Sequence, residues 1–92
     1  MGGLGMSLGQ NFPVGEYYKE RIIDAETIAR GGGSWTAVLV IKDPQTERPF
    51  LGFYRWEWDG EKWKTRKTIT FKNKQQVEKV YDSLSRLKEH FQ

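Results

Sequence analysis

Three stretches of the chain carry the hydrophobic patterning of β-strands. Residues 35–42 (WTAVLVIK) are apolar on both faces and rich in β-branched side chains, which is typical of an interior strand. Residues 50–58 form a second apolar stretch, rich in aromatic rings, and Asp59-Gly60 follows it directly. Because Asp-Gly between aromatic strands is a strong hairpin signal, we predict that residues 63–71 form the antiparallel partner strand.

The strand predicted over residues 63–71 has two different faces. Since side chains alternate along a strand, one face would carry Trp63, Thr65, Lys67, Ile69 and Phe71. The other face would carry Lys64, Arg66, Thr68 and Thr70. This second face is wholly polar and half basic, so we expect it to meet solvent or a ligand.

Residues 17–30 fit a helix and a strand equally well on local signals. A helix would align Tyr18, Ile22, Ala25 and Ala29 on one face. A strand would instead align Tyr17, Ile23, Ala25 and Thr27. Residues 31–34 (GGGS) are predicted to form a turn, and they lack the Lys-Ser/Thr ending of a phosphate-binding loop.

The last third of the chain has helical periodicity. Asn73 is a candidate N-cap, with Gln76 three residues later in a variant of the capping box. Apolar residues then recur at helical spacing, at Val77, Val80, Tyr81, Leu84, Leu87 and Phe91. We predict an amphipathic helix of about 18 residues that covers one sheet face and leaves the other open to a ligand. The expected fold class is α+β, a four-stranded antiparallel sheet followed by one C-terminal helix (ββββα).

Length and composition allow one small domain. The chain has 92 residues, and residues 1–15 contain five glycines and no charge, so we predict a flexible tail over 1–15 and a single domain over 16–92. With a mean hydropathy of −0.73, no stretch approaches the roughly 20 apolar residues of a membrane span. The absence of cysteine and of a basic, apolar N-terminal signal favours an intracellular location.

The net charge of +3 is divided unevenly along the chain. Residues 1–61 hold six Lys/Arg against nine Asp/Glu, whereas residues 62–92 hold nine against three. An aromatic cluster over residues 50–58 directly precedes the most basic stretch. Aromatic rings beside concentrated cations are typical of a surface for single-stranded nucleic acid, where rings stack on bases and cations hold phosphates.

Seven residues are candidates for that surface: Arg55, Trp56, Trp58, Lys62, Lys64, Arg66 and Lys67. Structural interpretations compete with this one. Trp56 and Trp58 share a strand face with Tyr54, so they could simply pack against the helix. Trp35 is better explained as a core or interface residue, and the basic run could be the solvated edge of a sheet.

Catalysis has little support in the sequence. The one histidine, His90, lies two residues from the C-terminus, and no cysteine is present to build a metal or thiol site. Glu57, Asp59 and Glu61 are close together, but no nucleophile or metal ligand set accompanies them. We therefore expect a binding protein without cofactor, metal or small-molecule substrate.

Residues 17–91 resemble the positive-cofactor-four family of transcriptional coactivators, which is related in fold to the plant Whirly proteins. The most specific part is Arg55-Trp56-Glu57-Trp58, then the hairpin Asp59-Gly60-Glu61, then Arg66-Lys67-Thr68-Ile69-Thr70-Phe71. The chain departs from the family in a shorter hairpin and in Thr68, where glycine is usual. Its first strand has no motif that aligns residue by residue.

The resemblance implies a fold, a partner and three contacts. The family has four antiparallel strands and one helix, forms dimers, and binds single-stranded DNA with little sequence preference. Family residues that match Arg55, Trp58 and Lys67 lie on the DNA surface. It also favours a long strand over residues 17–30.

These arguments together predict a homodimeric single-stranded DNA-binding protein of low sequence specificity, with a role in transcription, replication or repair. Two alternatives stay open. One is a single-stranded RNA-binding protein, because no ribose-reading motif is visible. The other is a protein-interaction module that uses the open aromatic sheet face.

Overall fold

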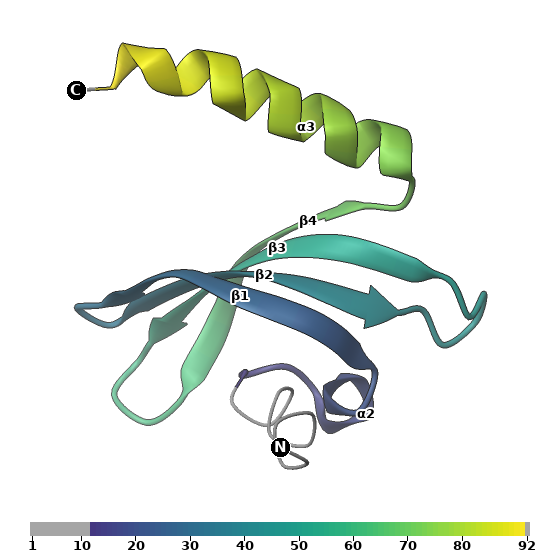
Figure 1. The fold of residues 1–92 in the computed structure, drawn as a ribbon. Coiled ribbons are helices and arrows are strands. Elements are labelled where there is room, and N and C mark those ends of the chain that lie inside the picture. The colour runs from purple at the N-terminus through teal and green to yellow at the C-terminus, as the bar shows by residue number, and fades with distance from the viewer. Residues whose placement is uncertain (1–11, 92) are drawn as a thin grey trace, which may run out of the picture.

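Four antiparallel strands form one sheet in the computed structural model, which describes residues 12–91 (Figure 1). The strands are β1 (Ile22–Gly31), β2 (Ser34–Lys42), β3 (Pro49–Trp58) and β4 (Trp63–Phe71), and they neighbour one another in chain order. The helices are α2 (Glu16–Lys19), α3 (Lys74–Leu87) and the 3₁₀ turn η1 (Lys88–His90). The predicted ββββα arrangement is confirmed.

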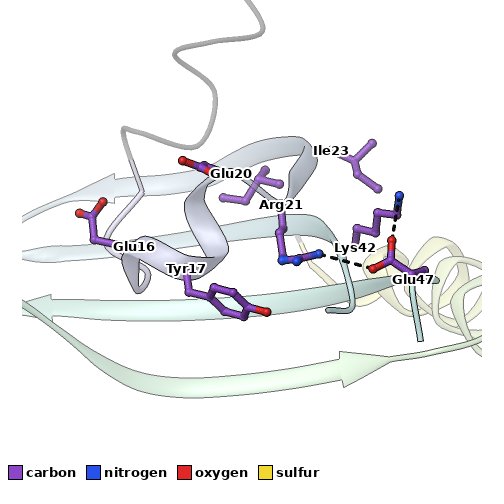
Figure 2. A pocket seen from close by; sticks show the side chains of 8 residues that line it. Glu16, Tyr17, Glu20, Arg21, Ile23, Lys42 and Glu47 are labelled. Carbon is purple, nitrogen blue, oxygen red and sulfur yellow. Dashed lines mark ion pairs between the residues drawn. The ribbon is translucent and has the colours of Figure 1, made fainter. Parts of the chain in front are cut away.

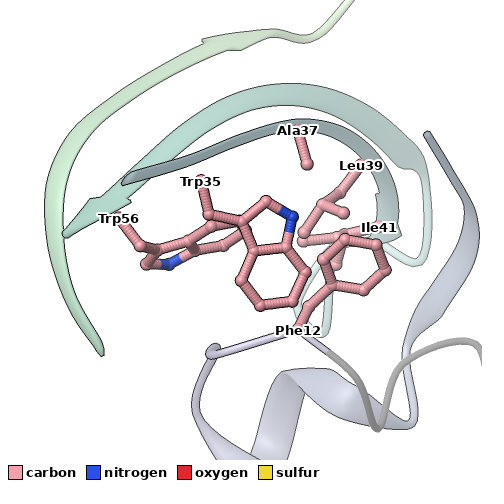
Figure 3. Close-up of a cluster of buried hydrophobic side chains, with 6 residues drawn as sticks. All are labelled: Phe12, Trp35, Ala37, Leu39, Ile41 and Trp56. Atoms are coloured by element: carbon pink, nitrogen blue, oxygen red, sulfur yellow. The ribbon is translucent and has the colours of Figure 1, made fainter. Parts of the chain in front are cut away.

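One face of the sheet carries the hydrophobic core. On β2, Trp35, Ala37, Leu39 and Ile41 are buried, while the residues between them are only half-buried. Trp56 of β3 lies opposite Trp35 and is also fully buried (Figure 3). We call this side the covered face, and the side that carries Val38, Val40, Leu51 and Phe53 the open face. The expectation that Trp35 is a core residue is confirmed.

The N-terminal segment covers the core, contrary to the predicted boundary at residue 16. Phe12 is only 7% exposed and packs among the core residues (Figure 3). Val14 packs against the same cluster. Residues 1–11 of the predicted tail lie outside the described residues. The domain therefore includes residues 12–15, because the sheet needs an apolar cover that its own strands do not supply.

Helix α3 does not cover a sheet face, which corrects the prediction from its periodicity. It stands away from the sheet, on the side opposite α2 (Figure 1). None of its residues is buried, and Tyr81 and Leu84 are 70% and 56% exposed. Phe91, which follows η1, is 81% exposed. Asn73 caps it as predicted, because its Oδ1 accepts a hydrogen bond of 2.9 Å from the Gln76 backbone N–H. The helix thus forms from local signals, but no part of the chain that the structure describes covers its apolar stripe.

The ambiguous stretch, residues 17–30, divides into two elements. Residues 17–19 belong to α2 and residues 22–30 to β1, and Glu20 and Arg21 connect the two. The pairing of β1 with β2 shifts at Ile23 and again at Ile28, and both side chains are more than half exposed. Each shift inserts one extra residue into β1 and interrupts the two-residue period of a strand. This interruption explains why the sequence fits a helix and a strand equally well.

Both predicted hairpin turns form around glycines with positive φ. Gly32 and Gly33 connect β1 to β2 with φ of 60° and 82°, a left-handed pair that suits a two-residue hairpin. Gly60 has a φ of 104° at the tip between β3 and β4. Among the described residues, no helix has the length and apolar character needed to cross a membrane.

Candidate nucleic-acid interface

A β-bulge in β4 places its cations on one side of the sheet. Arg55 pairs with Lys67 and Trp56 pairs with Thr65, so Arg66 is an extra residue between the two pairs. Thr65 therefore shares the covered face with Trp56, whereas Lys67 shares the open face with Arg55. The strict alternation expected for residues 63–71 is wrong at this point. The bulge adds Lys67 to the face that already holds Lys64.

Acidic side chains hold three of these cations in place. The Glu57 carboxylate accepts a hydrogen bond of 3.1 Å from Arg66 Nε and lies 3.3 Å from Arg55 Nη2. Lys64 Nζ lies 3.3 Å from Asp59 Oδ2. These side chains are about half exposed, apart from that of Asp59, and exposed ion pairs contribute little stability. A phosphate group could therefore replace a carboxylate at small cost.

Two further cations complete the group on the hairpin. Lys62 and Lys67 are exposed, and within residues 12–91 neither forms an ion pair. We call the set Arg55, Lys62, Lys64, Arg66 and Lys67 the hairpin cations. All five come from β3, β4 and the turn between them, as the sequence predicts.

The hairpin tip carries a pair of tryptophans on the covered face. Trp58 and Trp63 lie directly opposite one another, with ring centroids 5.5 Å apart in an edge-to-face arrangement. Trp58 is 47% exposed, so one ring of the pair is open to a ligand. Arg30 lies over this group, with its guanidinium carbon 3.8 Å from the Trp35 ring centroid and 5.4 Å from that of Trp63. Such a stacked cation can contact both a base and a phosphate.

Trp56 is placed differently from the other candidates. It is fully buried, and its ring is stacked on Tyr54 with centroids 5.6 Å apart. Its Nε1 donor is buried and has no hydrogen-bond partner among the described residues. Burial raises the pKa of Tyr54 above its ordinary value, so this neighbour stays neutral at physiological pH. Trp56 cannot stack on a base while residues 12–20 keep their position.

The candidate site is thus divided between two faces. The cations are on the open face or in the turn, and the accessible tryptophan is on the covered face. Only β4 separates them, and β4 is an edge strand. The sequence did not identify Arg30 as a member of this site, nor Phe12 as a residue that covers the neighbouring core. Nothing local marks Arg30, because its position over Trp35 depends on the pairing of β1 with β2.

The turn between β3 and β4 is held by one carboxylate. Asp59 Oδ1 accepts hydrogen bonds from the backbone N–H groups of Glu61 and Lys62, at 2.8 and 2.9 Å. These bonds, with a smaller contribution from Lys64, lower the pKa of Asp59 to about 2. Asp59 is therefore ionised at all physiological pH values and fixes the hairpin tip between the cations and the tryptophans.

A hollow lies beside α2 at the start of β1, at the end of the strand away from Arg30 (Figure 2). Glu47 lies between two cations there, 3.9 Å from Arg21 and 3.2 Å from Lys42. Glu16 and Glu20 also line it, so acids outnumber bases and it does not suit a phosphate. Among residues 12–91, no cluster of three His, Cys, Asp or Glu side chains has metal-binding geometry.

None of the protein families, curated proteins or solved structures compared with this chain matches it.

Proposed function

We propose that this protein binds single-stranded DNA with low sequence specificity at the β3–β4 hairpin. The observation that carries the proposal is the β4 bulge, which collects cations on one side of an edge strand while Trp58 is exposed on the other. Phosphates would contact the hairpin cations, and a base would stack on Trp58. The role is one of binding, without chemistry, and it implies an intracellular location, where single-stranded nucleic acid is found.

The geometry favours a single strand over a duplex. A ligand that contacts both the hairpin cations and Trp58 has to pass around the edge of β4. A flexible single strand can turn its bases towards one face and its phosphates towards the other. In a duplex the bases are paired inside a stiff helix, so they cannot reach Trp58 without unpairing.

RNA is the nearest alternative ligand. Cations and aromatic rings bind both nucleic acids, and preference for RNA requires contacts to the 2′-hydroxyl. Competition between a DNA and an RNA oligonucleotide of the same sequence separates the two. Stronger binding of the RNA would assign the site to RNA, and equal binding would show that the site does not distinguish the two sugars.

We further propose that the protein acts as a homodimer. Within the described residues of one chain, neither the apolar stripe of α3 nor the open face, where Ile69 is 53% exposed, is covered. In a two-fold dimer, α3 of each copy can lie on the open face of the other, so both surfaces are buried reciprocally. A protein-interaction module is the competing function, because the same surfaces could bind an unrelated partner.

The hairpin cations give the sharpest test of the proposed function. The triple variant Lys64→Ala, Arg66→Ala, Lys67→Ala should bind a labelled oligonucleotide of about 20 nucleotides more weakly. The slope of log K against log salt should become shallower by about 2. The matched control Lys79→Ala, Arg86→Ala, Lys88→Ala removes the same charge from α3 and the start of η1. Equal losses in both variants would show that binding depends on net charge alone and would overturn the hairpin site.

A further inference from the structure

The aromatic residues of the site form one continuous row that passes under the N-terminal segment. Trp63 links the exposed Trp58 to the buried Trp35, with ring centroids 5.5 Å from each. Trp35 in turn lies 5.3 Å from Trp56. Tyr54, stacked on Trp56, ends the row. Trp35 and Trp56, in the middle of the row, are buried beneath Phe12, whereas Trp63 and Tyr54 are half-buried and Trp58 is exposed.

Phe12 fills one position on this row as a nucleobase would. Its ring is stacked on Trp35, with centroids 5.3 Å apart and planes at 28° (Figure 3). It also lies 6.1 Å from the ring of Trp56. A flat ring against tryptophans is the geometry by which proteins hold unpaired bases.

Residues 12–20, which cover the core, contact the sheet through side chains alone. Backbone hydrogen bonds of residues 12–20 stay within the segment, such as Val14 N–H to Phe12 O and Tyr18 N–H to Gly15 O. The first backbone link to the sheet is Lys42 N–H to Arg21 O, at 3.0 Å. Residues 12–20 can therefore swing about Arg21 without breaking any backbone hydrogen bond to the described part of the sheet.

The covered state also leaves a polar group unsatisfied. Trp35 Nε1 donates to Thr27 Oγ1 at 3.1 Å, but Trp56 Nε1 is buried and has no partner within residues 12–91. A buried donor without an acceptor is unfavourable, and such groups are rare in folded proteins. Bases carry carbonyl and ring-nitrogen acceptors at their edges, and phenylalanine carries none.

We propose that Trp35, Tyr54 and Trp56 form a second base-stacking site, occupied in the free protein by Phe12. Single-stranded DNA that binds at Trp58 continues along the row and displaces residues 12–20. This inference rests on the proposed function. It makes Phe12 an internal competitor of the ligand and restores Trp56 as a base-stacking residue in the bound state.

Distances between paired spin labels test the displacement. The chain contains no cysteine, so Glu16→Cys with Gln45→Cys labels α2 and the β2–β3 loop specifically. Saturating oligothymidylate should lengthen and broaden the distance distribution of this pair. The control pair Glu26→Cys with Gln45→Cys spans β1 and the loop and should not change. DNA binding, measured by anisotropy, with an unchanged Glu16–Gln45 distance would overturn the inference but leave the proposed function intact.

Removal of the Phe12 ring tests the competition. Phe12→Ala should bind the oligonucleotide several-fold more tightly than the wild type and protect a longer stretch of it. Tyr17→Ala is the matched control, because it removes a 60% exposed ring from the same segment. Equal affinities of the two variants, with both folded by circular dichroism, would contradict the inference. If Phe12→Ala does not fold, the label distances decide. If the wild type binds no DNA, both proposals fail.

Discussion

At the scale of single residues, Glu57 controls how available the cations are. Its carboxylate contacts both Arg55 and Arg66, so two guanidinium groups share one acid. Both arginines are about half exposed, which leaves their outer N–H groups open to a phosphate. In the proposed function, Glu57 orients the cations in the free protein and competes with phosphate for them.

Neutralising Glu57 should therefore strengthen DNA binding. We expect Glu57→Gln to raise affinity about three- to tenfold at low salt, because exposed ion pairs are weak and phosphate contacts are salt-sensitive. Glu61→Gln removes the same charge from the same hairpin, where Glu61 forms no ion pair within the described residues. Titration calorimetry of both variants measures the difference. An equal gain from each would mean that the contacts of Glu57 are irrelevant.

The lowered pKa of Asp59 predicts that acid loosens the turn at the hairpin tip. Its pKa is lowered in the folded state, to about 2, so its stabilising contribution is present above its unfolded pKa, near 4. That contribution is lost as the pH falls from about 4 through about 2. The amide resonances of Glu61 and Lys62 should report the loss in an NMR titration. Asp59→Asn should show no such transition, and a transition that persists in it would assign the effect to another group.

Some residue roles follow from the sequence and others do not. Asn73 and Gly60 act through neighbours within a few positions, so local patterns identify both. Phe12 is a single apolar residue beside a glycine-rich stretch, and its burial depends on a sheet surface formed much later in the chain. Trp56 and Trp58 have the same local pattern and differ only in what covers them.

At the scale of elements, the bulge in β4 limits what periodicity can predict. The existence and ends of β2, β3 and β4 follow closely from the sequence. The sheet face on which Lys67 lies cannot be predicted in this way, because that face depends on how β4 pairs with β3 around Arg66. One inserted residue reverses the side of every residue that follows. Cross-strand charge pairing, such as that of Arg66 with Glu57, is the one signal that could have suggested it.

Helix α3 was predicted correctly as an element but not in its packing. Its periodicity indicates an apolar face, and a pattern cannot say whether that face meets its own sheet or another copy. Uncovered stripes on both α3 and the open face are the observation behind the dimer.

A charge in the apolar stripe should separate the two copies. Leu84 is 56% exposed in the single chain, so Leu84→Glu should cost the isolated monomer little stability. In a dimer it would bury an unpaired carboxylate, and the mass from light scattering should fall from that of two chains to one. Gln75→Glu, which adds the same charge to an exposed residue on the opposite side of α3, is the control. A wild type of monomer mass would contradict the dimer outright.

At the scale of the whole molecule, the fold gathers the basic excess of residues 62–92 onto one hairpin and one helix. The net charge is only +3, so long-range attraction to DNA is modest. Local arrangement therefore has to provide the affinity. The central claim is that three features together form a binding site for an unpaired strand. These features are the hairpin cations, the exposed Trp58 at the end of the aromatic row, and the position of β4 at the edge of the sheet.

Tryptophan fluorescence during titration with DNA tests this claim most directly. A single-stranded oligonucleotide of about 20 nucleotides is added to the wild-type protein at about 50 and 200 mM salt, with the matching duplex as control. We predict quenching that saturates, weakens at the higher salt and is much smaller with duplex. Unchanged fluorescence at low salt, with no shift of the oligonucleotide in a native gel, would contradict the account.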